Sequence, residues 1–164
     1  MAVVHCSAAT LRVIGDDLLP DEITRLLGCE PTAEQTKGQV IRHRSGRERV
    51  ARTGAWRLAV PDEEPADLNK QVAQLLGKLT DDLAVWKEIG SRFHVDLFCG
   101  LFMEEGVEGE TLSAETLEAL GSRGIELELD IYAPGDELNE EEPNQRVESN
   151  AGSAPRDQGG LLST

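Results

Sequence analysis

The stretch HVDLFCGLFM, residues 94–103, decides the fold because apolar residues occupy both of its alternating faces. In an extended chain, successive side chains point to opposite sides. One side here carries Val95, Leu97, Cys99, Leu101 and Met103, and the other carries Phe98 and Phe102. A strand that is apolar on both sides is typical of the interior of a sheet. The sequence therefore predicts a central strand over these residues.

Three other stretches alternate on one face only, as half-buried strands do. ATLRVI, residues 9–14, places Arg12 on its polar side, and GAWRLAV, residues 54–60, places Trp56 on its apolar side with Arg57 facing away. We expect the second stretch to pair with a segment inside residues 39–50, across a turn at Ser45–Gly46. IELELDIY, residues 125–132, alternates strictly: Ile125, Leu127, Leu129 and Ile131 are predicted to face inward, and Glu126, Glu128 and Asp130 outward.

Helical periodicity separates these strands. LPDEITRLLG, residues 19–28, predicts a short helix that ends at Gly28, and residues 66–79 carry the clearest apolar stripe of the chain. A third helix is expected after an N-cap at Thr80, and a fourth after an N-cap at Ser113. The inward-facing residues predicted for these last two helices are Leu83, Trp86, Ile89, Leu117 and Leu120.

The resulting element order is β-α-β-β-α-α-β-α-β, which predicts an α+β fold of two layers. Because one-sided strands need helices on their apolar side, we expect one mostly antiparallel sheet with helices packed on one face. A ferredoxin-like core is the topology that we consider first. We expect a single domain over residues 1–133. Residues 134–164 hold seven acids, two Arg and no aromatic residue, and this composition predicts an acidic disordered C-terminal tail.

The chain has 164 residues and a formal net charge of −15. Such acidity repels nucleic acid at long range and favours encounter with a basic protein partner. The chain starts without a signal-peptide pattern and contains no apolar run long enough for a membrane span, so we expect a cytoplasmic protein. Its three cysteines are widely spaced without a CxxC pair, so we expect free thiols, no metal and no cofactor. The oligomeric state is not determined by the sequence.

Several of these stretches occur together in a known family. LRVIGDDLLPDEITRLLGCEPT with the later KG, then TGAWRL, VDLFCGLFMEE and LSAETLEALGSRGIELELDIY, follow one another in the family's order within residues 9–132. In these pieces the chain resembles the bacterial domain-of-unknown-function family 4279. The resemblance implies a bacterial soluble protein and supports one domain. It supplies no activity, cofactor or catalytic residue to carry over.

Residues 37–57, KGQVIRHRSGRERVARTGAWR, form a basic arch with seven Lys or Arg, one acid and a net charge of +6. Because basic side chains bind phosphate, the arch holds the candidate anion-binding residues Lys37, Arg42, Arg44, Arg47, Arg49 and Arg52. A nucleic-acid site should interleave such residues with exposed aromatic ones, but Trp56 is assigned to the core. We therefore favour a solvated hairpin whose charge is balanced by acids of the same chain.

A second candidate region is the polar side of the strands. Its candidate residues for a small-ligand or catalytic site are Arg12, Arg57, Glu126, Glu128 and Asp130, which form a charged lattice if their strands are neighbours. Alternation requires polar residues on the wet side of a sheet, so we favour a plain surface. His94 and Asp96 share a side and could act as a base and its orienting carboxylate, but no nucleophile motif accompanies them. No residue is assigned as catalytic.

Our leading hypothesis is therefore a bacterial cytoplasmic protein with a non-catalytic protein-binding or regulatory domain. Surplus acid suits a basic protein partner. Two alternatives stay open: binding of an anion or nucleic acid by the basic arch, and a small-ligand or catalytic site on the open face of the sheet.

Overall fold

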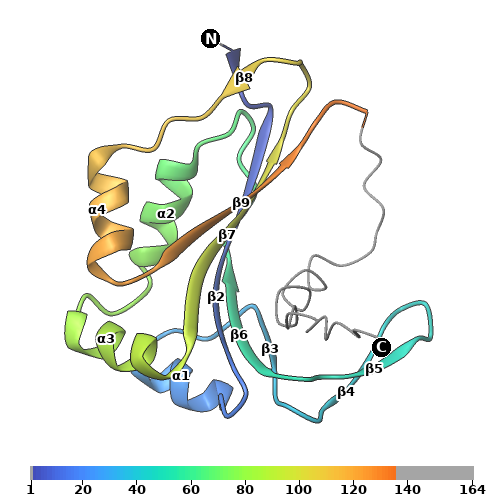
Figure 1. Cartoon of the computed structure of the whole chain (residues 1–164), viewed down its shortest axis with the longest axis vertical. Helices are drawn as coiled ribbons and strands as arrows, with labels where there is room; N and C mark the ends of the chain where they lie inside the picture. Colours follow the sequence, from blue (N-terminus) through green and yellow to red (C-terminus); the bar gives the residue numbers. More distant parts are fainter. Residues whose placement is uncertain (1, 136–164) are drawn as a thin grey trace, which may run out of the picture.

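The computed structural model describes residues 2–135, and a five-stranded sheet runs through them (Figure 1). In chain order its strands are β2 (Cys6–Gly15), β3 (Ala33–Gln35), β6 (Gly54–Ala59), β7 (His94–Phe102) and β9 (Glu126–Tyr132). In space they follow the order β3-β6-β2-β7-β9. Neighbouring strands are antiparallel, except that β7 and β9 are parallel. The sheet is thus mostly antiparallel, as predicted, and β7 lies in its interior.

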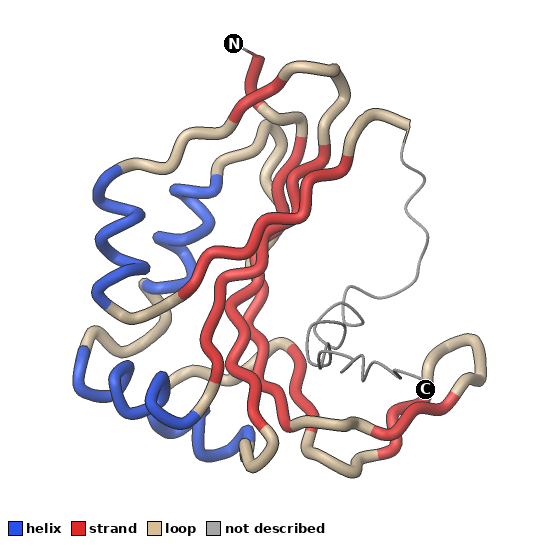
Figure 2. Tube along the Cα trace, in the orientation of Figure 1, coloured by secondary structure: helices blue, strands red, loops and turns tan. Residues whose placement is uncertain are grey.

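The helices form a second layer on one face of this sheet (Figure 2). They are α1 (Pro20–Leu27), α2 (Leu68–Leu76), α3 (Leu83–Arg92) and α4 (Ala114–Ser122). The hydrophobic core lies between the two layers, and Trp56 and Trp86 are its largest fully buried side chains. The predicted two-layer α+β fold is confirmed. The opposite face of the sheet carries no helix of the described residues.

The strand order differs from that of a ferredoxin-like core. The four longest strands lie in the order β6-β2-β7-β9, so the first of them in the chain lies between the second and the third. A ferredoxin-like sheet places its first strand between the third and the fourth. That topology was therefore wrong. Alternation in a sequence determines which face of a strand is buried, whereas it carries no information on which strand lies beside it.

Two small sheets stand apart from the large one. β4 (Val40–Arg42) and β5 (Glu48–Val50) form a hairpin, and β1 (Ala2–Val3) pairs with β8 (Glu108–Gly109). The turn predicted at Ser45–Gly46 closes the hairpin, where Gly46 has a positive φ of 80°. The predicted pairing of residues 39–50 with β6 was wrong, because β6 pairs with β3 and β2 instead. In Figure 1 the hairpin extends away from the body of the molecule on the side without helices.

Side-chain caps explain where three helices begin. The Lys70 backbone N–H donates to Asp67 Oδ1 at 2.9 Å at the start of α2, and the Thr116 N–H donates to Ser113 Oγ at 3.1 Å at the start of α4. The cap of α3 is Asp82, which accepts from the backbone N–H of Ala84 at 2.9 Å. Ser113 was predicted in this role, whereas Thr80 was predicted for α3 and lies two residues too early.

The inward faces predicted for α3 and α4 hold in part. Trp86, Ile89 and Leu120 are buried, but Leu83 and Leu117 are 49% and 51% exposed. Leu83 is the first residue of α3, where the helix has only begun to approach the sheet. On α4 the other buried residue is Thr116, which is 7% exposed and donates its hydroxyl to Asn69 Oδ1 at 2.7 Å. The acidic tail predicted for residues 134–164 lies, beyond Gly135, outside the described residues.

Candidate functional site

A buried ion pair lies on the sheet face that the helices leave open. Arg12 on β2 and Asp96 on β7 are directly opposite in register, with side chains only 8% and 2% exposed. Arg12 Nε donates to Asp96 Oδ1, and Arg12 Nη2 donates to Asp96 Oδ2, both at 2.7 Å. The Arg12 Cζ atom also lies 4.5 Å from the centre of the Phe98 ring. Paired hydrogen bonds of this kind are among the strongest between side chains, so the pair holds β2 to β7.

Two more side chains complete what we call the Asp96 cluster, defined as Arg12, His94, Asp96 and Glu128. Arg12 Nη2 also donates to Glu128 Oε2 at 2.7 Å, and His94 Nε2 lies 3.0 Å from Asp96 Oδ2. Burial by itself would lower the pKa of Arg12, but its hydrogen bonds to Asp96 and Glu128 and their negative charges raise the pKa above its ordinary value. Arg12 therefore serves as a permanently charged centre that two acids neutralise.

Among the described contacts, that between His94 and Asp96 most resembles a catalytic base and its orienting carboxylate. An imidazole base needs a nucleophile or a substrate within reach, and a carboxylate that orients it. The His94 side chain is 49% exposed, and its cross-strand neighbour is the apolar Ile14. Both oxygens of Asp96 already accept hydrogen bonds from Arg12. This arrangement stabilises the sheet by joining β2 to β7.

Of the other sheet-face candidates, Arg57 and Glu126 adjoin the Asp96 cluster in the strand register, whereas Asp130 lies away from it. Arg57 lies opposite Arg12 on the side away from Asp96, whereas Glu126 lies opposite Asp96 on β9. Asp130 is opposite Gly100, further along β9. Arg57 and Asp130 are therefore three strands apart, roughly 14 Å across the sheet at the usual strand spacing. The register brings Arg12 and Glu128 together and keeps Arg57 away from Asp130.

The basic arch is partly balanced by acids of the same chain, as expected. Lys37 Nζ lies 3.1 Å from Asp16 Oδ2. Arg42 Nε lies 2.6 Å from Glu48 Oε1, which is directly opposite it in the β4–β5 hairpin. All four side chains are more than half exposed, so each pair contributes little to stability.

The remaining arginines of the basic arch differ in their contacts. Arg49 Nη2 donates to Gln35 Oε1 at 3.2 Å, which fastens β5 to the edge of the large sheet. Arg44, Arg47 and Arg52 are exposed. Within residues 2–135, neither Arg44 nor Arg47 forms an ion pair, and both lie at the turn of the hairpin. These two residues are the part of the arch with charge still available to a ligand.

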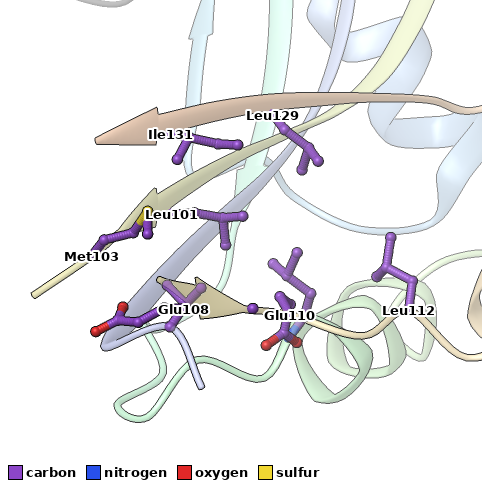
Figure 3. A pocket seen from close by; sticks show the side chains of 10 residues that line it. Leu101, Met103, Glu108, Glu110, Leu112, Leu129 and Ile131 are labelled. Carbon is purple, nitrogen blue, oxygen red and sulfur yellow. The ribbon is translucent and has the colours of Figure 1, made fainter. Parts of the chain in front are cut away.

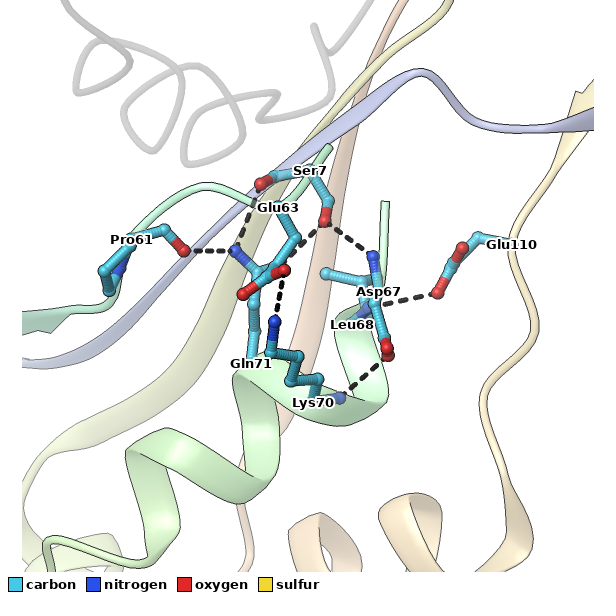
Figure 4. Close-up of polar contacts among 8 residues, drawn as sticks. All are labelled: Ser7, Pro61, Glu63, Asp67, Leu68, Lys70, Gln71 and Glu110. Carbon is cyan, nitrogen blue, oxygen red and sulfur yellow. Dashed lines mark hydrogen bonds and ion pairs between the residues drawn. The ribbon is translucent and has the colours of Figure 1, made fainter. Parts of the chain in front are cut away.

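A neutral polar network buried between β2 and α2 has no counterpart in the sequence analysis (Figure 4). Ser7 Oγ donates to Gln71 Oε1 at 2.8 Å and accepts from the Asp67 backbone N–H at 3.2 Å. Gln71 Nε2 donates to the carbonyl oxygens of Ser7 and Pro61, both at 3.0 Å. Ser7 and Gln71 are fully buried, and their side-chain groups have partners. The signal in the sequence is the position of Gln71, three residues after Leu68 on the apolar stripe of α2.

Two contacts of α2 extend this network toward the surface. Lys70 Nζ donates to Glu63 Oε2 at 2.7 Å, and the Leu68 backbone N–H donates to Glu110 Oε1 at 3.0 Å (Figure 4). The Leu68 N–H is one of the donors that a helix start leaves without an intrahelical partner. Glu110 therefore ties the loop that precedes α4 to the first residue of α2, and the whole network is a structural one.

An apolar hollow opens at the same end of the helix layer as this network, beside β9 (Figure 3). Its volume is about 240 Å³. Glu108 and Glu110 are the acids among its lining residues, and its main apolar walls are Val4, Leu68, Leu101, Leu112, Leu129 and Ile131. Leu129 and Ile131 are 42% and 61% exposed, although they face the helix side of the sheet. The predicted inward direction of both side chains is confirmed, but they are not buried as the prediction implied.

The incomplete cover of β9 has a simple cause. A short turn joins α4 to β9. The residues buried around it are Leu120, near the end of α4, and Ile125, just before β9 begins. Further along β9 the helix layer ends. The apolar alternation continues past this end, so two large side chains stay accessible to a partner.

An acid-lined hollow adjoins the apolar one. It is open, has a volume of about 370 Å³, and includes the acids Glu64, Glu104, Glu105 and Glu108 among its lining residues. His5 lies among these acids, with Nε2 3.7 Å from Glu64 Oε1. Glu108 lines both hollows, so the apolar and the acidic surfaces are continuous. None of these acids was singled out from the sequence as a group, because Glu64 is far from the others in the chain.

The groups most often used for metal binding or nucleophilic chemistry are dispersed. Among residues 2–135, no three His, Cys, Asp or Glu side chains lie in a group that could hold a metal ion. Burial raises the pKa of the Cys99 thiol to about 12, with a smaller contribution from the charge of Asp96. Cys99 is therefore a protonated thiol near neutral pH, and the reactive thiolate is not formed. The longest helix in the described range has ten residues, too few to cross a membrane.

Comparison with known proteins identifies the family of this chain. No curated protein and no solved structure matches it. A family model described as a domain of unknown function, DUF4279, matches residues 4–134, which include all the helices of the described part and its five-stranded sheet. The chain therefore belongs to the DUF4279 family.

Proposed function

We propose that this chain is a non-catalytic protein-binding or regulatory domain of the bacterial cytoplasm, and that its partner is a basic protein. One line of support concerns the reactive groups. Both carboxylate oxygens of Asp96 accept hydrogen bonds from Arg12, and Cys99 is fully buried with a raised thiol pKa. The exposed His94 lies opposite the apolar Ile14 in the pairing of β2 with β7. These features favour binding over catalysis.

The observation that carries the proposal is the continuous surface formed by the two hollows. Acids line one of them, and large exposed apolar side chains line the other. Protein interfaces combine an apolar centre with a polar rim, and charge complementarity steers the encounter of the two partners. A basic protein with an apolar centre to its interface is the partner that this surface fits. The net charge of −15 supports the same choice.

Recovery of the tagged full-length chain from its own host tests the proposal. We expect a companion of basic composition in a stoichiometric amount. Raising the salt from about 0.1 M to about 1 M shortens the screening length from roughly 10 Å to roughly 3 Å, so it should release much of the companion. A variant with Glu104→Lys and Glu105→Lys should recover less of it than the wild type does.

The matched control for this variant changes the same charge on the outside of α4. Glu115 and Glu118 are exposed there, so Glu115→Lys with Glu118→Lys should leave recovery unchanged. A chain that is recovered alone at low salt would contradict the proposed function. An acidic companion, or equal losses in both charge variants, would contradict the proposed surface.

A second candidate function is anion binding by the basic arch. It is favoured by one observation, the exposure of Arg44 and Arg47 at the hairpin turn without an ion pair in the described range. Binding to single-stranded nucleic acid or heparin should then be salt-sensitive and be abolished by Arg44→Glu with Arg47→Glu. No retention of the wild-type chain on either polyanion at low salt would end this candidate.

A further inference from the structure

β9 is an unusually accessible edge of the large sheet. It is seven residues long and pairs on one side with β7, while no described residue pairs with its other side. Edge strands carry backbone N–H and C=O groups that another strand can bond, and proteins usually protect them by shortening, bulges or proline. Residues 126–131 contain no proline, glycine or lysine. The opposite edge, β3, has only three residues.

The two faces of β9 differ in chemistry, and both are accessible. On the helix side, Leu129 and Ile131 are exposed and form part of the wall of the apolar hollow (Figure 3). On the open side, Glu126 and Asp130 form no ion pair within the described residues, whereas Glu128 already contacts Arg12. A strand added at this edge would place alternate side chains beside the hollow and beside the acids.

The hollow is better suited to side chains than to a separate small molecule. Its volume of about 240 Å³ lies below the roughly 300–1,000 Å³ of ordinary ligand pockets. It is open along β9, so an apolar side chain projecting from a neighbouring strand could enter it. This geometry matches the recognition mode in which an extended peptide extends a sheet and pockets accept its alternate side chains.

Charge decides which strand fits. In a β9–β9 pair between two copies, burying Leu129 and Ile131 on the same side would place the acids of both strands on the other side. Like charges opposite each other destabilise a strand pair, so a second copy is disfavoured at neutral pH. Lysine or arginine at the same positions would instead pair with Glu126 and Asp130.

We propose that the outer edge of β9 binds an extended segment of a partner protein as a sixth strand. The segment alternates apolar residues, which enter the hollow beside Leu129 and Ile131, with Lys or Arg, which face Glu126 and Asp130. This inference rests on the proposed function, because it specifies how and where the basic partner is recognised.

A synthetic peptide tests the inference on the full-length chain. The probe is an end-capped, fluorescent peptide of sequence KVKIKVK, and its control is KKVIVKK, which has the same composition without alternation. We expect KVKIKVK to bind more tightly, as measured by fluorescence anisotropy. On binding, amide hydrogen exchange should slow at alternate residues within Glu126–Ile131. Equal affinity for both peptides, or protection confined to other segments, would overturn the inference.

Variants of exposed and half-buried residues separate the two faces of β9. Glu126→Lys with Asp130→Lys should weaken binding of KVKIKVK about tenfold, because two favourable cross-strand pairs become repulsive. Glu115→Lys with Glu118→Lys makes the same change in net charge on α4 and should leave the affinity nearly unchanged. Ile131→Lys should also weaken binding, whereas Leu117→Lys, which places a lysine at a similarly exposed apolar position on α4, should not. Similar losses in the β9 variants and their controls would overturn the inference.

The same variants distinguish failure of this inference from failure of the proposed function. If the host companion is recovered equally by wild type and by the β9 variants, the protein-binding function stands and the β9 site is wrong. If no companion is recovered but KVKIKVK still binds at β9, the function is wrong while the strand-binding edge remains. Sedimentation adds a further check, since a dimer that Ile131→Lys dissociates would show that a second copy occupies the edge.

Discussion

The Asp96 cluster and the basic arch are both dense in charge, but their surroundings differ. In the cluster, Arg12 and Asp96 are almost completely buried and joined by two short hydrogen bonds. In the arch, Arg42 and Glu48 lie just as close, yet their side chains are 80% and 51% exposed. Water already solvates the second pair, so its loss leaves no charge stranded. Burial, and not the number of charges, should decide how much each region contributes to stability.

The largest effect is expected from Asp96→Ala. Removing the carboxylate leaves the guanidinium of Arg12 buried with only the half-exposed Glu128 as a partner, which should lower the free energy of unfolding by about 3–5 kcal/mol. Urea unfolding followed by the fluorescence of the buried Trp56 and Trp86 measures this loss. The double variant Arg12→Met with Asp96→Leu removes both charges and should recover much of the stability. If Asp96→Ala lowered the free energy of unfolding by less than about 1 kcal/mol, the buried pair would contribute no more than an exposed pair of the arch.

The next effect concerns the thiol of Cys99, buried on the other side of the same strand. Because its pKa is raised to about 12, against about 8.5 for an ordinary cysteine, the thiolate fraction near pH 8 is lower by more than about a thousandfold. Iodoacetamide should therefore modify Cys99 in the folded chain far more slowly than in urea. Mass spectrometry of the alkylated peptides measures both rates, with the half-buried Cys29 as an internal reference.

The same shift predicts how stability depends on pH. Between the unfolded pKa of about 8.5 and the folded pKa of about 12, the folded chain holds a proton that the unfolded chain has lost. The contribution of Cys99 to stability is therefore complete below pH ~8.5 and is lost as the pH rises toward 12. Cys99→Ala should flatten this alkaline decline in urea unfolding measured from pH 8 to 10. An unchanged slope would mean that burial around Cys99 is weaker than the fold implies.

A smaller loss is expected from the neutral network between β2 and α2. Gln71→Leu removes the partner of the Ser7 hydroxyl and two donors to backbone carbonyls, at a cost of about 1–3 kcal/mol. The cost should lie below that of Asp96→Ala, because no ionised group is left buried. Urea unfolding of the two variants under one condition gives the comparison. A larger loss for Gln71→Leu would show that hydrogen bonding outweighs charge in this core.

The smallest effect is expected in the basic arch. Arg44→Glu with Arg47→Glu should change the free energy of unfolding by less than about 0.5 kcal/mol, since both residues are exposed at the hairpin turn. Glu48→Gln should likewise cost little and less at high salt. Thermal unfolding at two salt concentrations checks both variants. A loss comparable to that of Asp96→Ala would show that the hairpin packs against the body of the protein.

The sequence analysis succeeded where local patterns determine structure. The two-sided apolar stretch at residues 94–103 predicted an interior strand, and β7 occupies that place. The Ser113 cap and the glycine stop at Gly28, which has a positive φ of 78°, also agree with the structure. Each of these predictions uses residues within one turn or one strand, where side-chain chemistry acts directly on the backbone.

The candidate sites could be predicted less well, because they join distant parts of the chain. Arg12 and Glu128 were both candidates, but their contact spans 116 positions and depends on strand order. The network of Ser7 and Gln71 spans 64 positions and was missed, although Gln71 interrupts an apolar stripe. The exposure of Leu129 and Ile131 was also missed. An alternating pattern shows the direction of a side chain but does not show where the covering helix layer ends.

The sequence by itself determined the faces of the strands, the positions of the helices and the excess of negative charge. These properties follow from spacing and composition, which act over a few residues. Only the tertiary structure decided that β9 lies at an edge, that Arg12 meets Asp96, and that the apolar side of β9 stays partly uncovered. The reason is that strand order and layer boundaries depend on how all the apolar faces of the chain are buried together, and no single segment contains that information.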